Sequence, residues 1–227
     1  MKRRSEPFEK LEDAVEAIEG GETEVDLHCG YIGDDGVKRV AAAVDKSKTL
    51  EWLDLSDNDI GEEGAKVLAA VVERSTTLQR LYLYGNRISD EGAKALAAAL
   101  EKSGTLEVLN LGSNRIGAEG TKAMASAIPR LPRLQTLDLR YNPYGFDGLR
   151  SLAAVLPLLP DGFQLNMDFR TKQVDRDFWE RATEEAPTRR AFFAFFCGSG
   201  RGGSAVGHFG RGDGDSSLSR RVFRALV

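Results

Sequence analysis

The sequence is poor in the residues that build disulfide frameworks and many catalytic centres. It holds two cysteines, Cys29 and Cys197, and two histidines among 227 residues. Two cysteines so far apart predict free thiols in a reducing compartment. Cys29 follows His28, but no second pair follows at the spacing of metal ligands. We therefore predict no metal site and no cofactor.

Long apolar runs and secretion signals are also missing. No apolar run approaches the roughly 20 residues that a transmembrane helix needs. No apolar stretch of a secretory signal follows the basic N-terminal segment, and no Asn-x-Ser/Thr acceptor occurs. These absences predict a protein without a membrane span, in the cytoplasm, with the nucleus as an alternative.

Charge is spread unevenly along the chain. The net charge is -4, but residues 187–227 hold seven arginines against two aspartates, about +5, which leaves about -9 for residues 1–186. Binding to nucleic acid requires a basic face. The acidic main body therefore argues against a nucleic-acid partner.

A period of 28 residues organises most of the chain. Each unit begins with leucines at alternate positions, as in a strand, and ends with apolar residues at helical spacing. The strand leucines include Leu53, Leu81, Leu109 and Leu137. The turn asparagines are Asn58, Asn86, Asn114 and Asn142, whose amides can bond backbone groups that the turn leaves unpaired.

One such unit cannot cover its own leucines, so the units must stack. The pattern predicts an α/β solenoid with a parallel inner β-sheet and an outer layer of α-helices. A glycine pair, such as Gly61 and Gly64, is expected to permit a tight entry to each helix. The helix after it is expected to bury Val67, Leu68, Val71 and Val72.

The units "LEWLDLSDNDIGEEGAKVLAAVVERSTT" and "LQRLYLYGNRISDEGAKALAAALEKSGT" resemble leucine-rich repeats of the ribonuclease-inhibitor-like type. The resemblance covers roughly Glu22 to Phe169. It implies a horseshoe-shaped solenoid in an intracellular protein. It implies little about function, because the repeat is a general scaffold for binding.

Four segments are expected. Residues 1–21 suit an N-terminal cap helix with Phe8, Leu11, Val15 and Ile18 on its inner side. Residues 22–170 hold about five repeats and a terminal strand, with Arg170 in the asparagine place. Residues 171–187 suit a C-terminal cap helix, and residues 188–227 form a Gly/Arg-rich tail for which we expect disorder. Three roles for the tail stay open: docking on the end of the solenoid, a free apolar segment, or an extension foreign to the protein.

The concave face of the solenoid is the candidate site. Residues between the strand leucines face it, and residues 28 apart lie on neighbouring strands. Trp, Tyr and Arg are the types that most often dominate protein interfaces. The expected partner-binding residues are Trp52, Asp54, Arg80, Tyr82, Tyr84, Asn110, Asp138 and Arg140. Aromatic residues that merely pack across strands are the alternative.

These features predict a non-enzymatic module, a monomer, that binds a protein partner and no small-molecule substrate. His28 lies beside acidic residues, but no set of nucleophile, base and orienting group accompanies it. One alternative is a regulator of a small GTPase, because the repeats also resemble those of the Ran GTPase activator. That hypothesis would use Arg87 and Arg115, although the resemblance transfers no functional residue. Another alternative is a fragment of a larger sensor or cytoskeletal scaffold.

Overall fold

The computed structural model describes residues 11–160 and 162–167, in which short strands and longer helices alternate. The strands are β1 (Glu24–Asp26), β2 (Trp52–Asp54), β3 (Arg80–Tyr82), β4 (Val108–Asn110), β5 (Thr136–Asp138) and β6 (Gln164–Asn166). The helices are α1 (Leu11–Glu19), α2 (Gly33–Val44), α3 (Glu62–Arg74), α4 (Asp90–Leu100), α5 (Ala118–Ala127) and α6 (Gly145–Val155). The 3-10 turns η1 (Ile128–Arg130) and η2 (Leu156–Leu158) follow α5 and α6.

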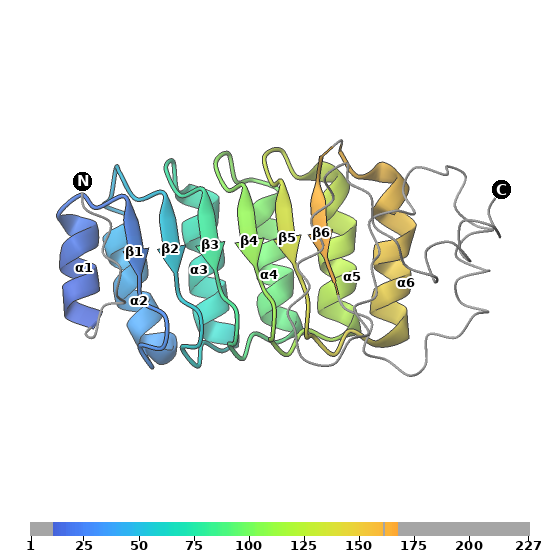
Figure 1. The fold of residues 1–227 in the computed structure, drawn as a ribbon, viewed down its shortest axis with the longest axis horizontal. Coiled ribbons are helices and arrows are strands. Elements are labelled where there is room, and N and C mark those ends of the chain that lie inside the picture. Colours follow the sequence, from blue (N-terminus) through green and yellow to red (C-terminus); the bar gives the residue numbers. More distant parts are fainter. Residues whose placement is uncertain (1–10, 161, 168–227) are drawn as a thin grey trace, which may run out of the picture. The chain divides into compact units, whose positions relative to one another are not determined.

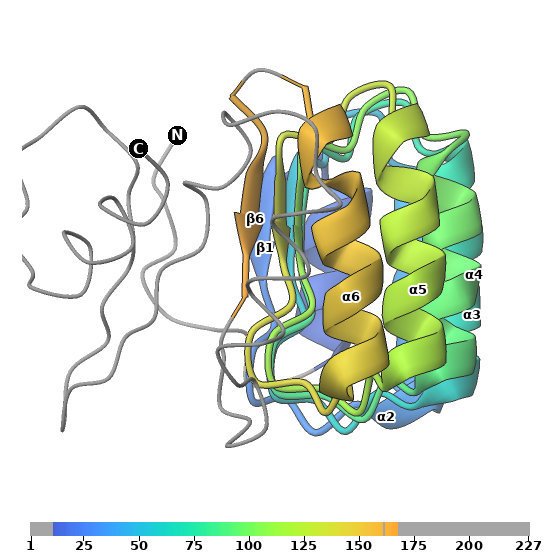
Figure 2. The ribbon, with the colours of Figure 1, turned by 90° about the vertical axis from the view of Figure 1, so that its right-hand side faces the viewer.

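The strands of the described residues form one parallel sheet in sequence order, from β1 to β6 (Figure 1). Each strand pairs with the next at a shift of one repeat, so that Leu53 lies opposite Leu81 and Leu81 opposite Leu109. Figure 2 shows the sheet as one layer and helices α2 to α6 as a second layer on one side of it. The predicted solenoid of parallel strands and outer helices is confirmed.

The core lies between the two layers. In the third repeat, Leu81 and Leu83 point from the strand into the core and have no exposed surface. Leu96 of α4 meets them from the helical layer and is equally buried. Burial of one leucine side chain contributes about 1.5–3 kcal/mol, so the repeated leucines account for much of the stability. The apolar residues of each repeat recur every second position where the chain forms a strand of the inner layer. They recur every 3.6 positions where it forms a helix of the outer layer.

The buried faces of two helices differ in part from the sequence prediction. In α3 the buried residues are Gly64, Ala65, Leu68, Ala69, Val71 and Val72, whereas Val67 is half-buried. In α1 the most buried residues are Ala14 and Ile18, whereas Leu11 and Val15 are half-buried against the core. Ala65 lies close to the next helix, since a Cβ at Gly92 of α4 would lie 2.8 Å from the Ala65 Cβ. The expected stripe holds only the larger apolar residues, whereas the structure also buries small ones.

The second glycine of the pair, Gly64, is required for packing, whereas the first glycine has a positive φ of 58° in two other repeats, at Gly33 and Gly145. Gly61 has a φ of -97° and lies in extended backbone that other residues also adopt. A Cβ at Gly64 would lie 2.5 Å from Oδ1 of Asp34 and 2.7 Å from Cγ2 of Ile60. The Asp34 carboxylate also accepts the backbone N–H of Gly61 at 2.7 Å. Glycine at position 64 thus leaves room for the preceding repeat, and the positive φ at the first residue of α2 and of α6 agrees with the expected tight entry to the helix.

The turn asparagines connect each repeat to the one before it. Asn86 donates from Nδ2 to the carbonyl oxygens of Leu55, at 2.9 Å, and Leu83, at 3.1 Å. Its Oδ1 accepts the N–H groups of Ile60, at 2.9 Å, and Asn58, at 3.1 Å. Bonds of the same kind to the preceding repeat recur at Asn58, Asn114 and Asn142. Each amide therefore satisfies backbone groups on two repeats at once.

The expected end segments are covered only in part. Helix α1 falls in the predicted cap of residues 1–21, but Phe8 lies outside the described residues. Strands β1 to β6 fall within residues 22–170. Arg170, the predicted cap helix of residues 171–187 and the tail of residues 188–227 also lie outside the described residues. The predicted boundaries of these segments stay predictions.

Candidate partner-binding face of the sheet

The face of the sheet turned away from the helices carries three rows of side chains, which we call the sheet face. The first row crosses Glu24, Trp52, Arg80, Val108 and Thr136. The second row crosses Asp26, Asp54, Tyr82, Asn110 and Asp138. A third row, just beyond the strands, holds His28, Ser56, Tyr84, Gly112 and Arg140. Because these residues alternate with buried leucines, all eight predicted site residues lie on this face.

The rings of Trp52 on β2 and Tyr82 on β3 pack together, and Tyr84 lies in the turn after β3 on the same face; we call these three residues the aromatic cluster. The rings of Trp52 and Tyr82 are 5.7 Å apart between centroids and are tilted by 53°. This separation lies in the favourable range for tilted aromatic pairs. The Tyr84 side chain is turned toward Gly112, where a Cβ would lie 3.0 Å from Tyr84 Cδ2. Tyr84 is 37% exposed, so the cluster is accessible at this edge.

Trp52 is half-buried, which the sequence did not indicate. Its neighbours in the first row are Glu24 on β1 and Arg80 on β3. Their charged groups approach to 4.0 Å, between Arg80 Nη2 and Glu24 Oε1. The two side chains therefore reach toward each other across the strand that carries Trp52. Such a half-exposed pair contributes little to stability, about 0–1 kcal/mol, and leaves the guanidinium accessible to a partner.

The second row has a structural role that the sequence analysis missed. Asp54 Oδ1 accepts the N–H of Ser56 at 2.8 Å, and Asn110 Oδ1 accepts the N–H of Gly112 at 2.9 Å. Asp26 and Asp138 accept the N–H two residues later in the same way. The sequence does contain a signal for this structural role, because an Asp or Asn occupies the second-row position in four of the five repeats. Tyr82 takes the place in the third repeat, and it is the residue particular to this copy.

Asp138 and Arg140, two predicted binding residues, are bonded to each other. Arg140 Nε lies 3.0 Å and 2.9 Å from the two carboxylate oxygens of Asp138, and Nη2 binds the same carboxylate. Asp138 is only 5% exposed. This charge-assisted pair occupies both groups, so the accessible part of the predicted site is the cluster on β2 and β3.

The β1–β2 end of the sheet face is electrostatically negative. Burial raises the pKa of the Asp54 carboxyl above its usual value, an effect that the hydrogen bonds from Ser56 oppose. The hydrogen bond to Asp26 raises the pKa of His28, whose Nδ1 lies 2.7 Å from Asp26 Oδ1. The carboxylates of Asp54 and Asp57 add to this effect on His28. The histidine is therefore paired with an acid and has no nucleophile bonded to it in the described residues.

The two arginines of the GTPase hypothesis have different environments. Arg87 Nη2 lies 2.9 Å from Asp59 Oδ1 in an exposed ion pair. Arg115 is exposed on the next turn. An arginine that binds the phosphates of a partner must first break any ion pair with a carboxylate of its own chain. Arg115 therefore suits that role better than Arg87.

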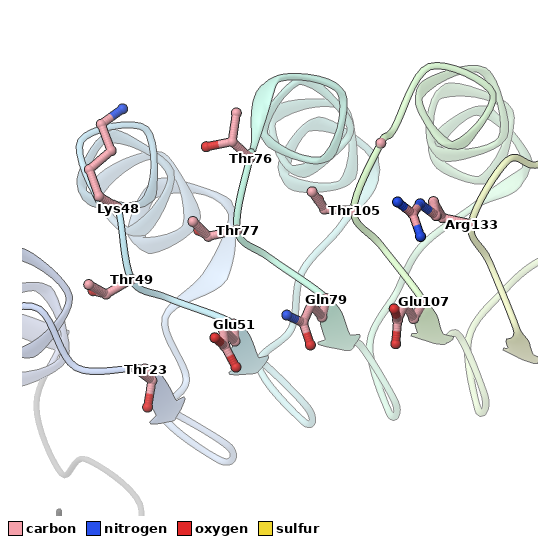
Figure 3. A pocket seen from close by; sticks show the side chains of 11 residues that line it. Thr23, Lys48, Thr49, Glu51, Thr76, Thr77, Gln79, Thr105, Glu107 and Arg133 are labelled. Carbon is pink, nitrogen blue, oxygen red and sulfur yellow. The ribbon is translucent and has the colours of Figure 1, made fainter.

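A polar groove of about 450 Å³ lies along the loops that lead into the strands (Figure 3). Its lining is Thr23, Lys48, Thr49, Glu51, Thr76, Thr77, Gln79, Gly104, Thr105, Glu107 and Arg133. Thr49 and Thr105 donate their hydroxyls to backbone carbonyls of Glu22, at 3.4 Å, and Ser75, at 3.3 Å. The groove thus repeats one loop structure, and its threonines stabilise the connection between repeats.

No group of three or more His, Cys, Asp or Glu side chains in the described residues is arranged to hold a metal ion. Cys29 is exposed as a free thiol. None of the described helices has the length and apolar character to cross a membrane.

Comparison with known proteins supports the repeat assignment. A family model described as "Leucine Rich repeat" matches three times, at residues 46–69, 74–97 and 102–125. Each match begins in one helix or the loop after it and ends in the next helix, so it spans one strand and one turn. No curated protein matches the sequence significantly.

Two solved structures share the fold. "Leiomodin-1 Actin-Binding Site 2 (ABS2)" aligns with a TM-score of 0.56 and 18% identity, over 77% of this chain and 95% of that one. The tropomodulin C-terminal domain of Caenorhabditis elegans aligns with a TM-score of 0.52 and 16% identity, over 63% of this chain and 89% of that one. Identity this low establishes a common architecture only. The sequence matches and the stacked strand–helix units together show that this chain contains leucine-rich repeats.

Proposed function

We propose that the protein is a non-enzymatic binding module that takes a protein partner on its sheet face. The observation that carries this proposal is the aromatic cluster, because Trp52, Tyr82 and Tyr84 gather on neighbouring repeats of an otherwise polar surface. Tryptophan and tyrosine are enriched among the residues that supply most of the binding energy of interfaces. Arg80, half-exposed beside the cluster, adds a fourth side chain of the same kind.

The surrounding groups support a rigid docking surface rather than a catalytic centre. The strands that carry the cluster are held by the core leucines and by the asparagine bonds between repeats. A partner then loses little free energy to ordering of the surface. We place the module in the cytoplasm. We also propose that it is a monomer, and sedimentation of the purified protein can test that oligomeric state.

The test replaces two members of the cluster together, Trp52→Ala and Tyr82→Ala. We expect the double variant to lose capture of partner proteins from a cell lysate while its circular dichroism spectrum stays that of the wild type. Tyr31→Ala is the matched control, because Tyr31 is 82% exposed in the turn after β1 and lies outside the three rows. Capture by the double variant that equals capture by the control would refute the proposal.

A cytoskeletal partner is the second candidate, favoured by the fold shared with an actin-binding site of leiomodin-1. Co-sedimentation with filamentous actin tests it directly. Binding that disappears in the Trp52/Tyr82 double variant would place actin on the sheet face. The GTPase alternative has less support, because the guanidinium of Arg87 is already paired with Asp59.

A further inference from the structure

The carboxylates next to the aromatic cluster define the chemistry of its partner. Asp54 on β2 lies opposite Tyr82 on β3 and opposite Asp26 on β1. Asp57 lies in the turn after β2, and its carboxylate occupies the space where Gly85, the residue after Tyr84, would carry a Cβ. Two acidic groups therefore flank the two tyrosines of the cluster.

In the described residues no internal cation is bonded to these two carboxylates: His28 acts on them through its charge alone, because its hydrogen bond goes to Asp26. Within the described residues neither Asp54 nor Asp57 forms an ion pair, although thirteen such pairs occur there. The nearby cations are directed elsewhere: His28 is bonded to Asp26, and Arg80 is directed to Glu24. Burial and the neighbouring Asp26 both raise the pKa of Asp54, so its charge is disfavoured where it stands. A cation brought by a partner would relieve this cost.

We propose that the sheet face receives a lysine or arginine side chain of the protein partner, held between the aromatic cluster and the carboxylates of Asp54 and Asp57. This inference rests on the proposed function of the same face and names the chemistry of its partner. Aromatic rings attract a cation through their faces, and the carboxylates supply the opposite charge. The two carboxylates would repel an acidic segment. A neutral apolar segment would remove water from the Asp54 carboxylate and supply no polar group in its place. Of the three kinds of partner, only a basic one gains from both features.

The experiment selects peptides from a random display library on the immobilised full-length protein. We expect the wild type to enrich peptides that contain lysine or arginine. The enriched peptide, synthesised with a fluorescent label, should bind about tenfold more weakly to the Asp54→Asn, Asp57→Asn double variant. Asparagine keeps the oxygen that accepts the Ser56 N–H, so the strand end stays intact. Asp35→Asn on α2 is the control, since its carboxylate is exposed and remote in sequence from the cluster, and it should leave the affinity unchanged.

The outcomes separate this inference from the function on which it rests. Enrichment of neutral or acidic peptides whose binding needs Trp52 and Tyr82 would overturn the cationic partner and leave the binding face in place. Basic peptides that bind the double aspartate variant as tightly as the wild type would also overturn it. Two outcomes would refute the binding face itself and with it the inference. In the first, the Trp52→Ala, Tyr82→Ala double variant enriches the same peptides as the wild type; in the second, the wild type enriches none.

Discussion

Replacement of one turn asparagine by alanine, Asn86→Ala, should test how the repeats are held together. The Asn86 side chain is 5% exposed and forms bonds with both its own repeat and the one before it. Its removal takes the acceptor from the N–H groups of Asn58 and Ile60. It also takes a donor from the carbonyl oxygens of Leu55 and Leu83. With the Tyr84 carbonyl, at 3.3 Å, five backbone groups lose a bond through one substitution. The carbonyls of Leu83 and Tyr84 keep another donor, from Asn114 and Asp57, so three groups are left without a partner.

The magnitude follows from the cost of an unsatisfied buried group. Each such donor or acceptor costs about 1–3 kcal/mol when no water replaces its partner. Some of these three groups will find water in the space that the amide leaves, so we expect Asn86→Ala to lower the free energy of unfolding by about 2–4 kcal/mol. The adjacent exposed residue gives a matched control: Arg87→Ala removes only the surface ion pair with Asp59 and should cost less than about 0.5 kcal/mol.

Urea unfolding followed by circular dichroism measures both values, and hydrogen exchange locates the change. The amide of Ile60 should exchange faster in Asn86→Ala than in the wild type beyond the change in global stability, because its acceptor has been removed. A loss of stability for Asn86→Ala no larger than that for Arg87→Ala would contradict the reasoning. It would mean that water substitutes fully for the side-chain amide.

Two further predictions concern charge and packing. The pKa of His28 is raised by the hydrogen bond to Asp26, so its charged form stabilises the fold below the unfolded-state pKa of about 6.5, and this contribution is lost as pH rises through the folded-state pKa. His28→Gln should therefore lower the free energy of unfolding by about 0.5 kcal/mol more at pH 5.5 than at pH 8.5, and an equal loss at both would count against the pair. Gly92→Ala should lower stability by about 1–3 kcal/mol although alanine favours helices, because its Cβ would lie 2.8 Å from the Cβ of Ala65. Gly104→Ala, where nothing lies within 4 Å, should change stability by less than about 0.5 kcal/mol in thermal unfolding, and equal effects of the two would refute the packing argument.

The sequence alone determined the architecture and the register of the sheet. A period of 28 residues in several columns leaves one way to stack the units, since a shift by a single residue would turn every strand leucine out of the core. The observed pairing of Leu53 with Leu81 and of Trp52 with Arg80 follows from that period. For the same reason the sequence by itself places the eight candidate residues on one face of the sheet.

Only the tertiary structure decided which of those residues are accessible and which are occupied. Arg140 is held by Asp138, whereas Asp54 and Asp57 form no ion pair within the described part of the chain. Trp52 packs against Tyr82 of the next repeat, and the side chains of Glu24 and Arg80 approach each other across its strand. The orientation of a side chain depends on the shapes of the neighbouring side chains on three strands, and a periodic pattern of residue types does not contain those shapes. The repeat therefore predicts the position of a residue in the sheet, and packing determines which groups it contacts.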